Sequence, residues 1–301
     1  MSQTNAIKAA LWMSGAVASF TSMAVAGREM AHELDTFEIM MYRSFLGIII
    51  VLSIASYTGT LRQINRNRLG LHFLRNLSHF TGQNLWFYAI ALIPFAQVAA
   101  FEFTTPLWVA LLAPLFLSEQ LTRVRVFAAI IGFSGILMVA KPGSVNIDSG
   151  TIAAALCALG FAGSMITTKL LSRTESTTCI LFWLTVMQAV FGIICAGFDG
   201  DIALPGTSTL PGIFVVGFAG LTAHYCLTTA LRFAPATIVS PLDFVRLPVM
   251  ALVGLLFYQE TLDSWFIFGA LLVLAGNIVN IYMEHFAGKK VQSKKQLHQT
   301  Q

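Results

Sequence analysis

Long apolar stretches, separated by short segments rich in charge, glycine and proline, divide the chain into ten parts. A helix needs roughly 20 apolar residues to cross a bilayer, and each stretch has about that length. None shows the ten-residue alternation of a membrane β-strand, so a β-barrel is rejected. The predicted spans are residues 6–27, 37–57, 69–91, 95–117, 124–140, 150–171, 178–197, 211–231, 237–257 and 264–284.

Composition supports a protein that lies in the membrane. Of the 301 residues, 56% are hydrophobic and only 11% are charged, and the mean hydropathy is +0.74. A soluble domain usually carries about 25% charged residues, so this chain could not cover a water-facing surface. We therefore expect an all-α integral membrane protein with ten transmembrane helices and no large soluble domain.

The basic residues predict the orientation. With the N-terminus inside, the inner loops hold 13 of them: Lys8, Arg62, Arg66, Arg68, Arg123, Arg125, Lys169, Arg173, Arg232, Lys289, Lys290, Lys294 and Lys295. The outer loops hold 2, Arg28 and Lys141. Because cytoplasmic loops carry an excess of lysine and arginine, both termini of a multi-pass membrane protein are predicted to be cytoplasmic. The pI of about 9.0 then reflects topology, and no nucleic-acid partner is expected.

Two further patterns do not change this picture. Lys8 and the apolar run ending in Ala24-Val25-Ala26 resemble a signal peptide, but the charge pattern and the repeat below both need the first helix. The cysteines Cys157, Cys179, Cys195 and Cys226 show no paired spacing and no neighbouring histidine cluster. We therefore expect neither disulfides nor a metal site, and no cofactor.

The sequence can be aligned with itself without a gap so that Pro94 falls on Pro235. The same shift places Glu102-Phe103 on Asp243-Phe244, Glu119 on Glu260 and Gly135 on Gly276. Because each half holds five spans, an odd number, the second half must enter the membrane from the opposite side. This predicts an inverted repeat, a recurring plan of secondary transporters, although apolar helices also match one another by chance. The predicted parts are residues 1–141, a linker 142–149, a second half 150–285 and a basic tail 286–301.

At these residues the chain resembles the EamA-like transporters of the drug/metabolite transporter superfamily. The resemblance rests on Arg232-Phe233-Ala234-Pro235-Ala236 and Ser240–Pro248 in the second half, and on Tyr42-Arg43, Arg75, Trp86-Phe87-Tyr88 and Pro106 in the first. It covers about residues 8–283 and implies two five-helix repeats. Members carry amino acids, vitamins, nucleotide-like cofactors and drugs. Within the superfamily the chain looks most like the bacterial branch with uptake systems for S-adenosylmethionine and riboflavin.

The charged residues inside predicted spans are the first candidates for a substrate site, because charge in a membrane is costly and usually faces a cavity. Asp243 and Arg246 are three residues apart, on one helix face, between Pro241 and Pro248. They form either a structural ion pair or a site for the two ends of a zwitterion. Glu102, the repeat mate of Asp243, either couples transport to a proton or pairs with Arg43.

The other candidates are polar or aromatic residues of the same spans. Arg43 and Arg75 either anchor their helices at the interface or bind an anion. His79 follows Arg75 by one turn, Gln83 and Trp86 continue that face, and His224 with Tyr225 could line the cavity from the other half; single hydrogen-bonded histidines are the alternative. Trp86 either stacks on substrate or only packs. The predicted substrate-binding set is Arg43, His79, Trp86, Glu102, His224, Tyr225, Asp243 and Arg246. Glu119 and Glu260, at helix ends, are expected to be structural.

These features favour a secondary active transporter that moves a small polar or amphipathic metabolite by alternating access. A P-loop of the GxxxxGK[ST] type is missing from the sequence, so ATP is not expected to drive transport within this chain. HExxH and GxSxG are missing too, and no enzyme activity is expected. The alternative is a channel or a structural membrane subunit. The expected partners are the substrate and the lipid bilayer, with a coupling proton and a homodimer left open.

Overall fold

The computed structural model describes residues 6–117, 123–140, 148–198, 200–233 and 242–279. Throughout these ranges the only regular structure is helical. The first half contains α1 (Ala6–Met30), α2 (Thr36–Tyr57), the short 3-10 helix η1 (Leu61–Gln63), α3 (Leu69–Leu92), α4 (Phe95–Glu102), α5 (Thr105–Leu117) and α6 (Arg123–Ala140). The second contains α7 (Ser149–Leu171), α8 (Thr177–Ala196), α9 (Leu210–Phe233), α11 (Arg246–Tyr258) and a final helix, Ser264–Val279.

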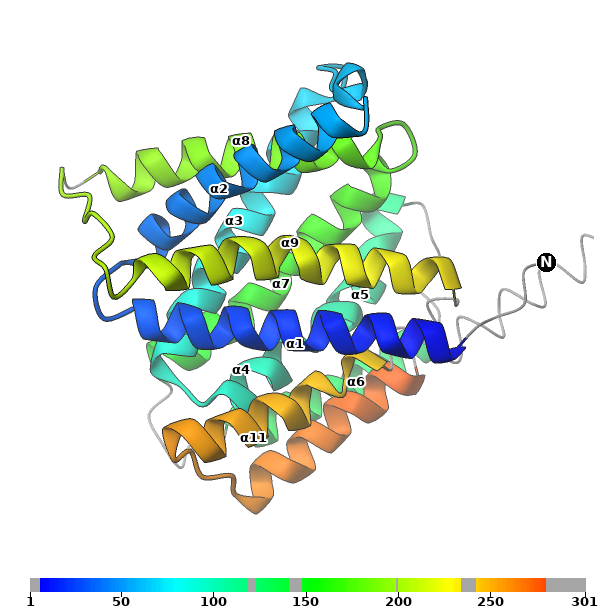
Figure 1. Ribbon diagram of the computed structural model, residues 1–301. Helices are drawn as coiled ribbons and strands as arrows, with labels where there is room; N and C mark the ends of the chain where they lie inside the picture. The colour runs from blue at the N-terminus through cyan, green and yellow to red at the C-terminus, as the bar shows by residue number, and fades with distance from the viewer. Residues whose placement is uncertain (1–5, 118–122, 141–147, 199, 234–241, 280–301) are drawn as a thin grey trace, which may run out of the picture.

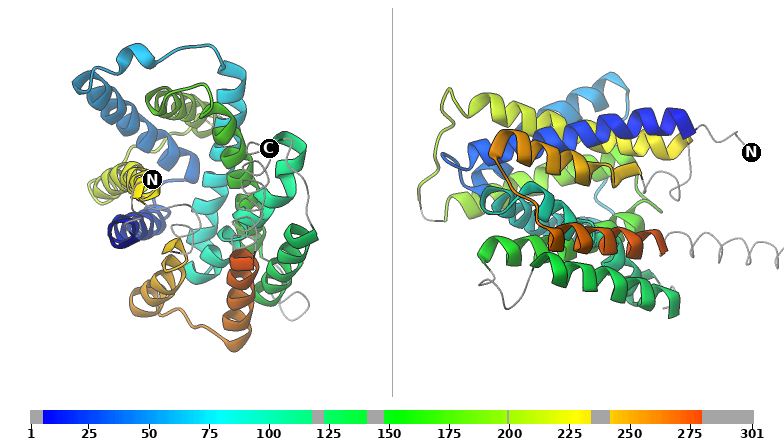
Figure 2. Two further views of the ribbon diagram at one scale, coloured as in Figure 1. Left: turned by 90° about the vertical axis from the view of Figure 1, so that its right-hand side faces the viewer. Right: turned by 90° about the horizontal axis from the view of Figure 1, so that it is seen from below.

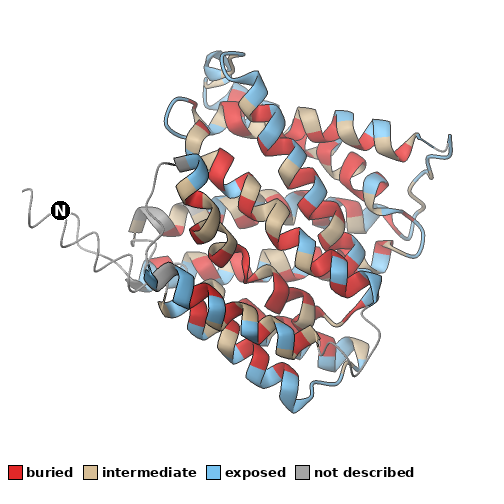
Figure 3. Ribbon diagram, turned by 180° about the vertical axis from the view of Figure 1, so that it is seen from behind, coloured by how far each residue is buried: buried red, intermediate tan, exposed pale blue. Residues whose placement is uncertain are grey.

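Six of the described helical segments are long and apolar enough to cross a membrane, and α6, α11 and the final helix are shorter apolar helices. Buried residues lie on the inward sides of the helices, and exposed residues lie on the outside of the bundle (Figure 3). Much of that outer surface consists of large apolar side chains, for example those of Leu115, Phe257 and Ile194. Because lipid tails are apolar, such a surface is stable in a bilayer and not in water.

The most polar of the long helices is α3, at the centre. Its buried side chains include His72, Arg75, Asn76, His79 and Gln83. A helix with so many polar groups cannot face lipid, because each would lose its hydrogen bonds to water. It packs instead against α7, α8, α1 and α2. The polar stripe of α3 is therefore the framework on which a site can be built.

Helix boundaries repeat under the shift that places Pro94 on Pro235. The start of α2 then falls on the start of α8, and α3 shares both its start and its end with α9. α5 and α11 also coincide at both ends. Contacts repeat as well: α1 packs on α9 as α3 packs on α7, and α2 packs on α8. Gly135 abuts the backbone of Gly269, and its mate Gly276 abuts Ala128, which is the same contact after exchange of the halves.

The two halves run in opposite directions. Arg28 at the end of α1 reaches the carbonyl oxygens of Ile90 and Ile93 at the end of α3, so α1 and α3 are parallel. Ser149, which begins α7, bonds Tyr88 near the end of α3, so α7 runs the other way. Since α7 is the mate of α1, these directions fit an inverted repeat. The start of α1 and the end of the final helix lie at the same end of the bundle (Figures 1 and 2).

Two predicted spans are not continuous helices, and this corrects the sequence-based expectation. The fourth span, predicted over 95–117, breaks at Phe103–Thr104 between α4 and α5. The ninth, predicted over 237–257, has a turn at Phe244–Val245 just before α11. Pro106 explains the first break, since it lacks the N–H that would continue the hydrogen-bond ladder. The linker 142–149 and the tail 286–301 lie almost entirely outside the described residues.

Candidate functional site

The two breaks place a carboxylate from each half at the centre of the bundle. Glu102 is the last residue of α4, and Asp243 directly precedes the turn before α11. The turns at 103–104 and 244–245 coincide under the repeat shift, so they are mates. At the first break the amide of Thr104 bonds the carbonyl of Phe101, one residue closer than in an α-helix. Broken helices facing each other in this way form the ion and substrate sites of many transporters.

Arg246 joins the two carboxylates. Its Nη1 donates to Glu102 Oε2 at 3.1 Å and its Nη2 to Glu102 Oε1 at 3.0 Å, a two-pronged bond between the halves. Nη2 also donates to Asp243 Oδ2 at 3.2 Å. Trp86 of α3 donates its Nε1–H to Glu102 Oε2 at 2.9 Å. We call Trp86, Glu102, Asp243 and Arg246 the acidic cluster, because two carboxylates meet one guanidinium.

Aromatic rings cover the guanidinium of Arg246. The rings of Phe20 in α1 and Phe103 at the first break lie 4.8 and 5.0 Å from its Cζ atom. Phe103 packs edge-on against Phe244, its repeat mate. Rings at this distance stabilise a cation through their negative faces and also keep water away. The cluster still has unused capacity, since Arg246 Nε and Asp243 Oδ1 are buried without a hydrogen-bond partner.

A second group of polar side chains lies between α2, α3, α8 and α9 and is basic. It consists of Arg43, Arg75, His79 and His224, with Gln188 beside them. His79 Nδ1 and Gln188 Nε2 are 2.6 Å apart. Arg75 donates only to neutral groups, Thr168 Oγ1 at 3.1 Å and Asn76 Oδ1 at 2.8 Å. Within the described part of the chain, neither Arg43 nor Arg75 forms an ion pair. We call these five residues the basic cluster.

Arg43 is the member of the basic cluster whose charge its neighbours balance least. Its Nη1 is shielded from solvent and has no hydrogen-bond partner. It borders a small cavity of about 20 Å³ that His224 and Gln188 also line, room for about one water molecule. Gly47, Gly217 and Gly220 form other parts of the cavity wall. The cavity exists because glycine has no side chain to fill this space. A buried cation without a counter-ion is costly, so Arg43 is a candidate for binding an anionic group.

One face of α3 connects the two clusters. His79, Gln83 and Trp86 follow one another at intervals of four and three residues, which is the spacing of neighbours on a helix face. His79 and Trp86 are therefore about 10 Å apart along the axis, at about 1.5 Å per residue. Between them Gln83 is only 5% exposed, and its Nε2 has no hydrogen-bond partner. A ligand lying along this face would meet a negative end, a free amide donor and a positive end.

The structure brings most of the predicted residues together and separates one. Trp86, Glu102, Asp243 and Arg246 form one cluster, and Arg43, His79 and His224 belong to the other. Glu102 pairs with Arg246 and not with Arg43, which corrects that alternative.

Tyr225 is the residue that the structure separates from both clusters. It is 65% exposed and packs edge-on against Trp12. Because successive side chains on a helix point about 100° apart, Tyr225 points away from its neighbour His224. It therefore does not share the cavity of His224.

Gln188 and Phe20 contact the clusters but were not predicted. Both are ordinary residues for a membrane helix, and no spacing in the sequence singles them out. Gln83 was expected on the face of α3 but not in the site. Its unpartnered amide is visible only in the structure.

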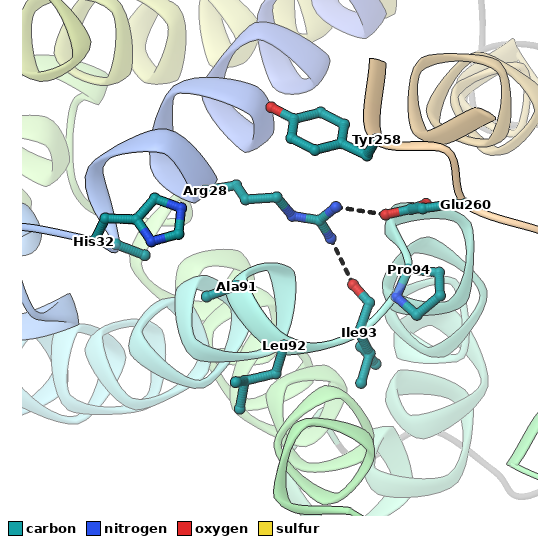
Figure 4. A pocket seen from close by; sticks show the side chains of 9 residues that line it. Arg28, His32, Ala91, Leu92, Ile93, Pro94, Tyr258 and Glu260 are labelled. Atoms are coloured by element: carbon teal, nitrogen blue, oxygen red, sulfur yellow. Dashed lines mark hydrogen bonds and ion pairs between the residues drawn. The ribbon is translucent and has the colours of Figure 1, made fainter. Parts of the chain in front are cut away.

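Glu260 has the structural role expected of it, at the end of the bundle where α1 ends. It pairs with Arg28, and its carboxylate accepts the backbone N–H of Phe95 at 3.0 Å, at the start of α4. These groups line a vestibule of about 580 Å³, with Tyr258 and His32 (Figure 4). Glu260 thus ties the second half to α1 and α4 of the first. Its mate Glu119 lies outside the described residues.

The model of the EamA-like transporter family matches the chain twice, over residues 7–141 and 148–282. These two matches cover most of the chain and fall one on each half. A solved crystal structure has the same fold, with a TM-score of 0.64 at 16% identity, over 91% of this chain and 96% of that one.

Several curated proteins are similar to the chain over most of their length. An S-adenosylmethionine uptake transporter of Rickettsia bellii is 26% identical over 94% of this chain and 95% of its own. A riboflavin transporter of Brucella anthropi is 28% identical, over 80% and 86%. A pseudopaline exporter of Pseudomonas aeruginosa is 26% identical, over 86% and 91%. The relatives are thus named for different small metabolites, and for both uptake and export.

Proposed function

The chain belongs to the EamA-like transporter family, and we propose that it is a secondary active transporter of a small polar or amphipathic metabolite. It carries this metabolite across the bacterial inner membrane by alternating access. In that mechanism the two halves, residues 1–141 and 150–285, rock around a site between them. The proposal fits relatives that are named as carriers of small molecules.

The observation that carries the proposal is the pair of clusters on one face of α3. A surplus carboxylate at one end and an unpaired guanidinium at the other are complementary to a ligand with both charges. Amino acids, and cofactors that contain an amino-acid group, have this chemistry. S-adenosylmethionine, which the relative from Rickettsia bellii is named for, carries a carboxylate, an amine and a sulfonium. We therefore place zwitterionic metabolites first and flat, aromatic vitamins second.

Each part of the site has a separate role in this proposal. Arg43, with His224 and His79 nearby, binds the anionic group. Asp243 and Glu102 attract the cationic group while Arg246 keeps them from repelling each other. Trp86 holds Glu102 in place and offers its ring to the substrate. A coupling proton remains an untested partner in this proposal.

Orientation and assembly are also part of the proposal. We place both termini in the cytoplasm, which is supported by the 13 basic residues of the inner loops against 2 outside and by the shared end of the first and last described helices. A C-terminal phosphatase fusion that is active in the periplasm would contradict this. A homodimer remains an untested partner, which cross-linking in native membranes would detect.

The test uses purified protein in two formats. In detergent, S-adenosylmethionine, neutral amino acids and riboflavin are compared for their ability to raise the melting temperature, since a ligand that binds only the folded state stabilises it. In proteoliposomes, uptake of the stabilising compound should saturate. Gln83→Leu, which removes the unpartnered amide donor, should weaken the apparent affinity for the compound at least tenfold in both formats. Tyr225→Phe, on the exposed side of α9, is the matched control and should change neither.

Two results would overturn the proposal. Conductance far above carrier turnover in a planar bilayer would mean a channel. Equal stabilisation and uptake in Gln83→Leu and the parent would remove the face of α3 from the site. A compound that stabilises the parent and Gln83→Leu equally binds elsewhere, which would mean a wrong site. A compound that stabilises neither protein is simply not the substrate.

A further inference from the structure

Three side chains of metal-ligand type that belong to neither cluster meet inside the protein. His72 is in the first turn of α3, Glu175 lies between α7 and α8, and Cys179 is in the first turn of α8. Their ligand atoms all lie within 4.8 Å of one another. His72 and Cys179 are 0% exposed and Glu175 is 8% exposed. The three residues come from both halves of the chain.

These groups are poorly satisfied by the protein alone. The Nδ1 of His72 is buried with no hydrogen-bond partner. Among the described residues, the one hydrogen-bond contact of its Nε2 is with the Sγ of Cys179, at 3.9 Å. The Glu175 carboxylate accepts a hydrogen bond from Asn65 Nδ2 at 2.6 Å, but no ion pair involves it within the described ranges. A buried imidazole without a strong partner and a buried carboxylate without a cation both cost free energy.

We propose that His72, Glu175 and Cys179 bind one divalent cation of the zinc type. Zinc is held by thiolate, imidazole and carboxylate groups, and these three supply one of each. A thiolate and a carboxylate carry two negative charges, so the bound cation makes a neutral complex, which suits a buried place. A metal bound at Nε2 also gives the imidazole a stronger partner than the sulfur of Cys179, 3.9 Å away.

The distances are close to those of a bound state. Tetrahedral zinc, with bonds of about 2.3 Å to sulfur and about 2.05 Å to nitrogen, separates the two donors by about 3.6 Å. The Sγ of Cys179 and the Nε2 of His72 are already 3.9 Å apart. The carbonyl oxygen of Asn65 lies 3.7 Å from the same Sγ, so this oxygen or a water can complete four ligands.

Neighbouring contacts hold the site in shape before any metal arrives. Trp183 donates its Nε1–H to the carbonyl of Asn65 at 2.7 Å. Ser176 caps α8 by accepting the amide N–H of Cys179 at 3.2 Å. The side chains that would bind the metal are therefore positioned from both sides, by the loop that contains Asn65 and by the start of α8. Such preorganisation favours binding because little ordering remains to be done.

Cobalt(II) is the probe, because thiolate ligation gives it a charge-transfer band in the near ultraviolet and tetrahedral geometry gives strong visible bands. The full-length protein is purified without a polyhistidine tag, treated with chelator and titrated. One equivalent of Co²⁺ per chain should produce both features, and Zn²⁺ should abolish them by displacement. Zn²⁺ should also raise the melting temperature.

Variants decide whether these three residues are the ligands. Cys179→Ser should remove the charge-transfer band, and His72→Gln and Glu175→Gln should weaken Co²⁺ binding at least tenfold. Cys226→Ser, a buried cysteine away from the site, is the matched control and should behave like the parent. A parent protein with no thiolate band would overturn the proposal and leave a hydrogen-bonded trio. So would a band that survives in Cys179→Ser. None of these readouts depends on transport.

Discussion

Removing Arg246 should be the most destabilising single change in the acidic cluster. Its guanidinium is 4% exposed and forms a two-pronged bond to Glu102 as well as a contact with Asp243. Arg246→Gln leaves two carboxylates facing each other in a place from which water is largely excluded. Breaking a buried pair by removing one partner costs about 3–5 kcal/mol. At about 2–4 °C per kcal/mol for chains of about 150–250 residues, the melting temperature should fall by about 6–20 °C.

The same geometry predicts which second change restores stability. The double variant Arg246→Gln, Glu102→Gln has the same net charge as the parent cluster and keeps two side chains that can bond each other. It should recover most of the lost stability. Asp243→Asn alone should matter much less, about 1 kcal/mol at most, because that side chain is 26% exposed and has one contact at 3.2 Å with Arg246. The double variant should fold and yet not transport.

The assay is the melting temperature of each variant in one detergent, read by size-exclusion chromatography after heating, together with the amount of folded protein in membranes. Proteoliposome uptake is then measured for the variants that fold. An Arg246→Gln protein that melts within about 2 °C of the parent, less than about 1 kcal/mol, would refute the assignment of a strong buried pair. A double variant that transports normally would remove the pair from the substrate site.

Three further predictions test other parts of the structure. Arg43→Met should keep or raise the melting temperature, because Nη1 has no partner to lose, but it should abolish binding of an anionic ligand in the thermal-shift assay. Gly135→Val should cut the yield of folded protein several-fold, since even a Cβ would lie 2.5 Å from the carbonyl oxygen of Gly269; Gly70→Ala, with nothing within 4 Å, should be neutral. Glu260→Gln should lower the melting temperature by a few degrees, by weakening the ion pair with Arg28, and Glu260→Asp should lower it less.

Much of the helical plan could be predicted from the sequence because it depends on local patterns. Apolar length gave the helices close to their observed ends, and the ungapped shift of Pro94 onto Pro235 matched the observed helix boundaries. The break at Phe103–Thr104 was not predicted, although Pro106 follows it closely. The partners of Glu102 at this break, Trp86 and Arg246, lie on other helices, and a local pattern does not contain that information.

Contacts between the two halves could not be predicted from the spacing of residues in the sequence. The interval from Asp243 to Arg246 suggested their pairing, yet the stronger partner of Arg246 is Glu102, 144 residues away. His224 and Tyr225 were placed together because they are adjacent, although adjacent side chains of a helix diverge. His72 and Cys179 lie in different halves of the chain, and a search for closely spaced cysteines and histidines does not detect such a pair.

The bond between Glu260 and the start of α4 has a consequence for how often the protein opens at that end. Any outward swing of the second half must withdraw a carboxylate from Arg28 and from the amide of Phe95. Hydrogen bonds to charged groups contribute about 1.5–3 kcal/mol each, so each one lost makes the opened form about 10- to 150-fold rarer. Under the proposed alternating access, the empty protein should therefore spend most of its time accessible from one side of the membrane only, and a bound substrate must offset that bias before it can leave on the other.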